Sequence, residues 1–310
     1  MQRLLLIANP SSSQFTGGGH RTVVRILSRR FDVEPAWPQS ADHARQLTAQ
    51  AVADGFDVVA AMGGDGVVHH VAHVLTGTET ALGVVPTGTT NVFARLLGIP
   101  PKPNPAAKLL AGPHERHRTS LLALNGVQEG REVRRHAIFA AGFGFDATVV
   151  ARAEKEPYRK YHFGGLHYAR TAVSTLFGEY RKRKPHVQVH AAGHQAHAVA
   201  VLIQFRRIYT YFGRLPLRFS PELPAPLSVL VVEALPARRV GRIGAAVLGG
   251  ADLDDLPGMS VWTGLDSLNL EADPPVAGQA DGESTGSWQS ALVVLQPEAL
   301  QVVVPPSSRR

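Results

Sequence analysis

The chain has 310 residues, of which 44% are apolar and 18% are charged, and its formal net charge is +7. This composition is typical of a globular protein with a sizeable core and argues against a mostly disordered chain. Because there is no cysteine, disulfides, thiolate zinc sites and cysteine nucleophiles are excluded. The length favours two domains, at roughly 150 residues for each.

Strand and helix patterns alternate through the first 120 residues. Apolar runs predict strands at residues 4–8, 31–36, 57–62 and 82–86. Helical spacing predicts helices at residues 23–27, 41–53, 67–75 and 91–97, and residues 11–19 are expected to form a polar Ser- and Gly-rich loop. This alternation predicts a parallel, doubly wound sheet. Ligands of such sheets bind at the carboxyl ends of the strands.

The second half of the sequence is rich in short strand patterns separated by Gly, Pro and Asp. Strands are expected at residues 120–124, 132–140, 187–190, 196–205, 227–234, 267–272 and 291–295, and helices at residues 166–177 and 240–249. This pattern predicts an antiparallel sheet or sandwich. Residues 100–105 resemble a connector. We therefore expect domains at residues 1–118 and 119–296, with the tail 297–310 as a candidate to pack back on the first.

Positive charge is concentrated at residues 151–186, which hold 9 Lys and Arg against 3 Asp and Glu. Such a block attracts an anionic membrane surface or nucleic acid, and the alternative is a solvated basic loop. A nucleic-acid partner is disfavoured because the block lacks a binding motif. No apolar run approaches the ~18 residues that cross a bilayer, and the N-terminus does not resemble a signal peptide. A cytoplasmic protein is expected.

Three loops that follow predicted strands carry candidate phosphate-binding residues. Residues 63–66 read Gly-Gly-Asp-Gly, and residues 86–91 read Pro-Thr-Gly-Thr-Thr-Asn; the third loop, residues 9–13, reads Asn-Pro-Ser-Ser-Ser. Glycines let backbone approach a phosphate closely, and a following helix supplies free N–H donors. Asp65 lies where a carboxylate could hold Mg²⁺ against a polyphosphate. Alone, Gly-Gly-Asp-Gly is more often a tight turn, but three such loops in one parallel sheet favour an anion site.

Taken together, these motifs resemble the diacylglycerol kinase catalytic family, which includes bacterial lipid kinases and sphingosine kinases. Asn9 and Pro10 match its opening motif, and residues 63–66 match its nucleotide loop. Residues 86–95, which read Pro-Thr-Gly-Thr-Thr-Asn-Val-Phe-Ala-Arg, are the most specific match. Residues 141–146 resemble the segment that opens the second domain, and the Asp-Gly-Glu run at residues 281–283 matches a late motif. The motifs follow the family's order over nearly the whole chain.

The resemblance implies an ATP-binding α/β domain, a C-terminal antiparallel β-sandwich domain, and an active site in the cleft between them. It implies ATP and Mg²⁺ as cofactors, with Asp65 as a candidate for the nucleotide-bound metal. Asp281 would be the catalytic base, with Glu283 beside it. The candidate ATP-binding residues are Asn9, Ser40, Gly63, Gly64, Asp65, Gly66, Thr89 and Asn91.

The residues around Asp281 also support a catalytic role independently of the resemblance. Phosphoryl transfer needs a group that accepts or orients the proton of the attacking hydroxyl. A carboxylate next to Gly282 is expected on an accessible turn. Asp281 and Glu283, two residues apart in an extended segment, would point to the same side. The alternative is an ordinary acidic turn before a strand.

The sequence departs from the family pattern at two places. Val67 replaces the usual Thr after Gly-Gly-Asp-Gly, and His69 and His70 replace the Asn-Glu that normally follows. His69 and His73 have i, i+4 spacing, as metal ligands can have, but a helix face with partly exposed histidines is favoured. In the region where bacterial relatives bind a structural Mg²⁺, Glu222 is the only acid, so that site is not expected here.

The sequence therefore predicts an ATP-dependent lipid kinase of phospholipid metabolism, peripheral on the cytoplasmic membrane face. Its substrate would be diacylglycerol or a related lipid, and residues 151–186 would contact anionic lipid. One alternative is a soluble kinase of the same superfamily that acts on NAD or a sugar phosphate, which the 86–95 run disfavours. The other is a catalytically impaired nucleotide- or lipid-binding relative, for which Val67, His69 and His70 are the argument.

Overall fold

The computed structural model of the chain describes residues 1–154, 171–172, 174–180, 183–212, 215–217, 226–235, 240–249 and 253–306. The chain divides into two compact units. Unit 1 comprises Met1–Leu121 and Gln296–Arg310, and unit 2 comprises Leu122–Leu295. Among the described residues, no helix is both long and apolar enough to cross a membrane.

Unit 1 contains a parallel sheet with the order β4-β3-β1-β2. The strands are β1 (Gln2–Ala8), β2 (Phe31–Ala36), β3 (Val58–Gly63) and β4 (Ala81–Pro86). Beyond β4, Val302 of the long strand β16 (Glu283–Val304) pairs in parallel with Leu82. Every residue of β3 and β4 is buried, because helices cover both faces of the sheet.

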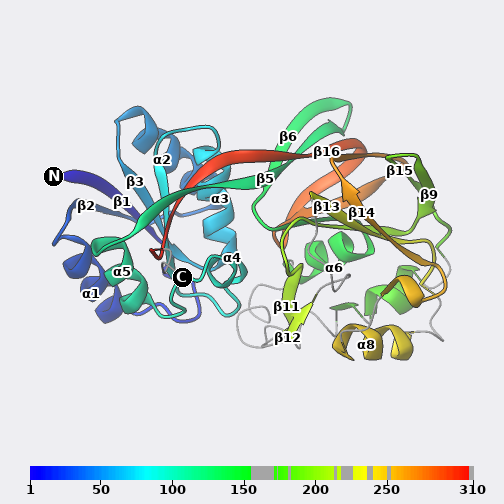
Figure 1. The fold of residues 1–310 in the computed structure, drawn as a ribbon, viewed down its shortest axis with the longest axis horizontal. Helices are drawn as coiled ribbons and strands as arrows, with labels where there is room; N and C mark the ends of the chain where they lie inside the picture. The colour runs from blue at the N-terminus through cyan, green and yellow to red at the C-terminus, as the bar shows by residue number, and fades with distance from the viewer. Residues whose placement is uncertain are drawn as a thin grey trace. The chain divides into compact units, whose positions relative to one another are not determined.

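Helices of unit 1 pack around its sheet, and four of them form two pairs. The described helices are α1 (Gly17–Leu27), α2 (Ala41–Ala53), α3 (Asp65–Leu75), α4 (Val92–Leu96) and α5 (Pro103–Ala111). Helices α1 and α5 pack together, as do α2 and α3 (Figure 1). Leu4 and Leu6 join the core under α1 and α5, so by strand alternation Leu5 and Ile7 face the opposite layer. The predicted doubly wound arrangement is therefore confirmed.

Two helices of unit 1 differ from the sequence prediction. Residues 17–19, expected in a loop, form the first turn of α1, because Thr16 caps that helix: its Oγ1 accepts a 3.0 Å hydrogen bond from Gly19 N. Residues 103–105, expected in a connector, begin α5. Pro103 fits there because the first turn of a helix does not need its N–H.

Unit 2 is built on an antiparallel sheet with the order β14-β13-β10-β7-β15-β16. These strands are β7 (Ala140–Gly144), β10 (Ala200–Gln204), β13 (Leu227–Val232), β14 (Met259–Leu265), β15 (Ser267–Ala280) and β16. The hairpin of β8 (Val187–Ala191) and β9 (His194–Ala198) pairs with the first part of β15, and β7 pairs with its last residues. A large apolar core, centred on Phe143 and Trp288, fills this unit.

The remaining elements of unit 2 complete this β-rich unit. They are β5 (Glu115–Gln128), β6 (Arg131–Ala137), β11 (Thr210–Phe212), β12 (Leu215–Leu217), α6 (Phe145–Glu154), the π-helix Leu176–Tyr180, α8 (Val240–Gly249) and the 3₁₀ helix Leu253–Asp255. The unit boundaries fall within β5 and β16. The predicted strand at residues 196–205 is two strands, β9 and β10, that separate at Val199. Part of the predicted helix 166–177 lies outside the described residues. An α/β unit and an antiparallel β-rich unit confirm the predicted fold class.

Candidate functional site

Three loops meet at the carboxyl edge of the unit 1 sheet, because β1, β3 and β4 are parallel neighbours. Asn9 N donates a 2.9 Å hydrogen bond to Met62 O at the end of β3. Thr87 N donates a 2.9 Å bond to Gly63 O. The structure thus brings the three predicted phosphate-binding loops together in a row.

The β1–α1 loop is tied to the β4–α4 loop through side chains as well as backbone. The Ser12 and Thr87 hydroxyl oxygens are 2.7 Å apart and buried, and those of Ser13 and Thr89 are 3.1 Å apart. Gln14 donates twice, from its backbone N to Thr87 O at 2.8 Å and from Nε2 to Gly88 O at 3.0 Å. The sequence motif included Thr89, but nothing in the local pattern singled out Gln14.

Glycines keep the ends of these loops in close contact. A Cβ at residue 88 would lie 2.5 Å from the Cα of Gly64, and a Cβ at residue 63 would lie 2.9 Å from the Val67 side chain. Gly64 is the N-cap of α3 and has no side chain to bond the first turn of that helix. The amides of a first helical turn have no intrahelical acceptor and lie at the positive end of the helix dipole, so this helix end suits an anion.

Asp65, on the first turn of α3, bonds the start of a different helix. Its Oδ2 accepts a 3.0 Å hydrogen bond from Val92 N, and its Oδ1 accepts a 3.2 Å bond from Phe93 N. Asp65 therefore caps α4. Asp65 is also the only acid in the three loops as the structure bounds them, at residues 9–16, 63–66 and 87–91. Nucleotide-bound Mg²⁺ is typically held by one or two carboxylates together with substrate phosphates, so this donor set fits a metal that arrives with a polyphosphate. No cluster of three His, Asp or Glu suited to a metal occurs among the described residues.

Asn91 closes the β4–α4 loop from inside. It is buried and has φ of 50°. Its Oδ1 accepts a 3.1 Å hydrogen bond from Gly88 N, and its Nδ2 donates a 2.8 Å bond to Gly88 O. Asn91 is the N-cap residue of α4, but its side chain makes no cap bond, and Asp65 bonds the start of the helix instead.

Two further predicted ATP-site residues have local roles in unit 1. Asn9 Oδ1 accepts a 2.9 Å hydrogen bond from Ser11 N, which shapes the start of the loop. Ser40 is the N-cap of α2 and accepts a 3.1 Å bond from His43 N. Ser40 follows β2, the outermost strand on that side, and no hydrogen bond described in the structure joins it to the three loops.

The histidines that depart from the family pattern lie where α3 packs on α2. His69 is buried, so the expectation of a partly exposed histidine face is wrong for this residue. The ring Nδ1 of His70 is 3.2 Å from Arg45 Nη1. Burial, with further contributions from His69 and Arg45, lowers the pKa of His70 to about 3. The His70 ring is therefore neutral at physiological pH.

In unit 2, Asp281 and Gly282 form the two-residue turn between β15 and β16. Ala280 pairs with Glu283, and φ is 56° at Asp281 and 81° at Gly282, as a type I′ hairpin requires. The expectation of an extended segment with Asp281 and Glu283 on the same side is therefore wrong.

The Asp281 carboxylate is also not accessible as expected, because its side chain is only 3% exposed. Oδ2 accepts a 2.8 Å bond from Ile138 N, and Oδ1 accepts bonds of 2.9 and 3.2 Å from Phe139 N and Ala140 N. Asp281 N donates in turn to Ala140 O at 2.9 Å. The carboxylate thus holds the segment between β6 and β7, whereas Glu283 is partly exposed.

A buried polar network beside this turn was not predicted from the sequence. Tyr209 Oη donates a 2.6 Å hydrogen bond to Asp146 Oδ2, and Gln279 Nε2 donates a 2.9 Å bond to the same oxygen. Gln279 Oε1 accepts a 2.9 Å bond from Gly282 N, so the network reaches the turn. Burial raises the pKa of Asp146. Gly142 is the local signal, since a Cβ there would lie 2.7 Å from Asp146 Oδ2.

Comparisons with known proteins agree with the motifs. Residues 3–121 match the family model of the diacylglycerol kinase catalytic domain. A diacylglycerol kinase of Mycobacterium tuberculosis is 34% identical over 156 residues, which cover 49% of this chain and 49% of that protein. The match thus spans about half the length of that relative. A probable lipid kinase YegS-like of Pseudomonas aeruginosa is 29% identical over 295 residues, covering 92% of this chain and 88% of the relative.

A solved structure shares the fold over both units. A putative diacylglycerol kinase from Bacillus anthracis superposes with a TM-score of 0.75 at 21% identity, covering 99% of this chain and 96% of that one. At that identity the likeness shows the fold alone. The family assignment rests on the sequence matches: residues 3–121 match the diacylglycerol kinase catalytic domain family.

Proposed function

We propose that the protein is an ATP-dependent lipid kinase that phosphorylates a hydroxyl of diacylglycerol or a related lipid at the cytoplasmic membrane face. The observation that carries the proposal is the junction of three hydrogen-bonded loops at the start of α3, where Gly64 is the N-cap and no side chain bonds the first-turn amides. The family match supports the same reaction class.

In this proposal unit 1 binds the nucleotide. The first-turn amides of α3, at Gly66 and its neighbours, hold phosphate oxygens, and the Ser13 and Thr89 hydroxyls line the same loops. A Mg²⁺ ion bound with the nucleotide would neutralise charge on the transferred phosphoryl group, next to Asp65. Asn9 and Asn91, whose polar atoms bond within the loops, shape the site, and Ser40, the N-cap of α2, is proposed as a further ATP-binding residue.

In the same proposal, unit 2 binds the lipid that accepts the phosphoryl group. The lipid hydroxyl attacks the γ-phosphorus, the bond to ADP breaks, and the hydroxyl proton passes to a carboxylate. Glu283 is partly exposed. Asp281 is buried and its carboxylate accepts three backbone bonds, so its first role is to fix the turn that carries Glu283.

Membrane contact through residues 151–186 is part of the proposal, although most of that segment lies outside the described residues. Its described arginines make contacts within unit 2. Arg152 pairs with Glu179, and Arg183 lies over the Tyr180 ring at 4.9 Å. The proposed membrane contact therefore depends chiefly on the other basic residues of the segment.

ATP consumption against a panel of diacylglycerol, a sphingoid base, phosphatidylglycerol and NAD tests the function. ADP formation with one of the lipids, lost in Gly64→Val, is expected. Turnover of NAD without lipid would contradict the proposal and favour a soluble kinase. ATP-analogue binding without turnover on any acceptor would favour an impaired relative, for which Val67 and the neutral His70 are the structural argument.

A further inference from the structure

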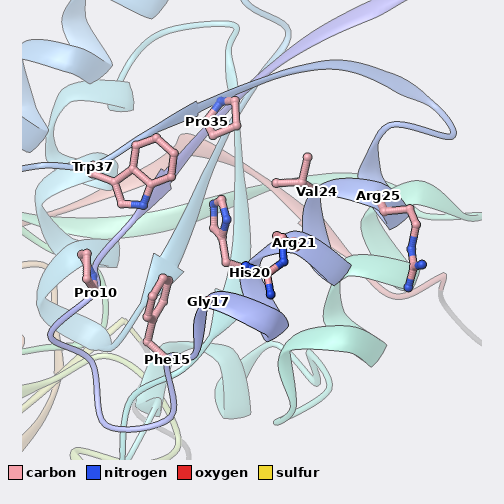
Figure 2. Close-up of a pocket in the computed structure, with 9 residues that line it drawn as sticks. All are labelled: Pro10, Phe15, Gly17, His20, Arg21, Val24, Arg25, Pro35 and Trp37. Carbon is pink, nitrogen blue, oxygen red and sulfur yellow. The ribbon is translucent and has the colours of Figure 1, made fainter.

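Unit 1 contains an apolar hollow that the proposed kinase reaction does not use. Its volume is about 660 Å³, and it lies between α1, the β1–α1 loop and the end of β2 (Figure 2). Phe15, Val24, Pro35 and Trp37 supply its apolar surface, and His20, Arg21 and Arg25 line it from α1.

Three aromatic rings form a row in this hollow. The His20 ring lies between those of Phe15 and Trp37, with centroid distances of 5.9 and 5.2 Å (Figure 2). The Trp37 side chain is 49% exposed, although the other two tryptophans, Trp262 and Trp288, are buried. An exposed tryptophan next to basic side chains is typical of protein surfaces that insert into the headgroup region of a bilayer.

His20, which lines the hollow, carries a buried polar atom that has no hydrogen-bond partner within the described chain. The side chain is 8% exposed, and its Nε2 has no hydrogen-bond partner among the described residues. Burial, and then the neighbouring Arg21, lower the pKa of His20, so the ring is neutral. An unpaired buried polar atom is unfavourable, and a neutral ring that carries its proton on Nε2 can donate it to a ligand oxygen.

The charge around the hollow is positive throughout. Residues 1–31 contain five arginines and no Asp or Glu. Asp32 and Glu34 alternate along β2 with Pro35, which lines the hollow, so both acids face the other side of the strand. In the part of the chain that the structure describes, no carboxylate forms an ion pair with Arg21 or Arg25.

We propose that this hollow binds a single anionic membrane lipid. The phosphate would lie at Arg21 and Arg25, one helical turn apart, and His20 Nε2 would donate to a phosphate or ester oxygen. The start of an acyl chain would pack against Phe15 and Trp37. A nucleobase fits less well, because apart from the arginines the described lining offers only the His20 ring and the Trp37 N–H as polar groups, and a base edge needs several partners, acceptors included.

Tryptophan fluorescence can test this proposal, because Trp37 is the exposed member of three tryptophans. The full chain is mixed with phosphatidylcholine vesicles that contain or lack phosphatidylglycerol brominated on its acyl chains. Quenching with the anionic lipid is expected, and Trp37→Phe should lose the quenching while it still sediments with the vesicles. If the wild type sediments with the anionic vesicles but its fluorescence is not quenched, the proposed site is overturned. Another surface of the protein would then make the membrane contact.

Charge variants provide the second arm of the test. Arg21→Gln with Arg25→Gln should weaken binding to the anionic vesicles roughly tenfold to thirtyfold, at about 1 kcal/mol for each residue. The matched control, Arg131→Gln with Arg134→Gln, makes the same charge change at exposed positions of β6 in unit 2 and should have a much smaller effect. If both double variants lose the same amount of vesicle affinity, the effect comes from net charge alone and the proposed site is overturned.

A nucleotide competitor separates this site from the proposed kinase site. An ATP analogue should leave the quenching of Trp37 unchanged, and relief of quenching by the analogue would place a nucleotide in the hollow and overturn the lipid proposal. Lipid phosphorylation measured in neutral detergent micelles should be unaffected in Arg21→Gln with Arg25→Gln. The kinase function and the lipid site can therefore fail independently.

Discussion

Gly64 and Gly88, which follow the ends of β3 and β4, approach each other so closely that a side chain at residue 88 does not fit. A Cβ at residue 88 would lie 2.5 Å from the Cα of Gly64 and 2.8 Å from Asn91 Oδ1. Two loops that are more than twenty residues apart in the sequence thus share one small volume.

Gly88→Ala should weaken ATP-analogue binding at least tenfold, because the methyl group forces the β4–α4 loop away from the start of α3. Isothermal titration of the folded variant measures the loss. Gly241→Ala is the matched control, since a Cβ at that exposed position of α8 meets nothing within 4 Å. If Gly88→Ala binds the ATP analogue as tightly as the wild type, then nucleotide binding does not depend on the close contact between Gly64 and Gly88.

Asp65→Ala should lower the free energy of unfolding by about 0.5–2 kcal/mol, the usual cost of losing a helix cap. Both carboxylate oxygens cap α4, so the loss is expected without any nucleotide present. Denaturant unfolding of the ligand-free protein measures it, with the exposed Asp32→Ala as the control. If only nucleotide binding changes, then the two amide bonds do not contribute to stability.

Asp281→Asn should destabilise the protein by about 1–3 kcal/mol, because an amide cannot accept all three backbone bonds and leaves a buried N–H unpaired. Turnover on lipid should fall together with stability. Glu283→Gln, at a partly exposed position, should keep its unfolding midpoint while turnover falls. A stable but inactive Asp281→Asn would instead favour the base role that the sequence suggested.

His70 should make stability depend on pH. Its pKa is about 3 in the folded chain and about 6.5 when unfolded, so the unfolded chain binds more protons between these values. Stability is therefore present above pH 6.5 and is lost as the pH falls toward 3. The slope approaches about 1.4 kcal/mol per pH unit.

Denaturant unfolding at pH 7, 6 and 5 measures the effect of His70. His70→Gln should flatten the profile, whereas His197→Gln, at an exposed position of β9, should preserve the wild-type dependence. Identical profiles for the wild type and His70→Gln would contradict the assignment.

Regular segments could be predicted from the sequence where local pattern and tertiary environment agree. The bounds predicted for β2, α2 and α8 match the structure, and α2 begins at a clear N-cap, Ser40. The three loops of unit 1 were also predictable, since parallel strands place their carboxyl ends at one edge. The Asp-Gly pair at residues 281 and 282 was a hairpin signal in the sequence, and the extended interpretation overlooked it.

Long-range polar contacts could not be predicted in the same way. Asp146, Tyr209 and Gln279 come from three separate segments and meet only because β7, β10 and β15 are neighbours in the folded sheet. The bond from Asp65 to the start of α4 joins residues 27 positions apart, whereas the side chain of the N-cap residue, Asn91, makes no cap bond. Hydrophobic periodicity in the sequence does not indicate which distant residues will form hydrogen bonds with one another.

The return of β16 to unit 1 has a consequence for biosynthesis. Leu300, Val302 and Val303 are buried there, and Ala299 O accepts a 2.8 Å bond from Gly77 N. The first 121 residues therefore leave the ribosome long before the segment that completes their sheet has been synthesised. The edge of β4 stays uncovered while the whole of unit 2 is translated, so the sheet of unit 1 is completed only after unit 2 has been made.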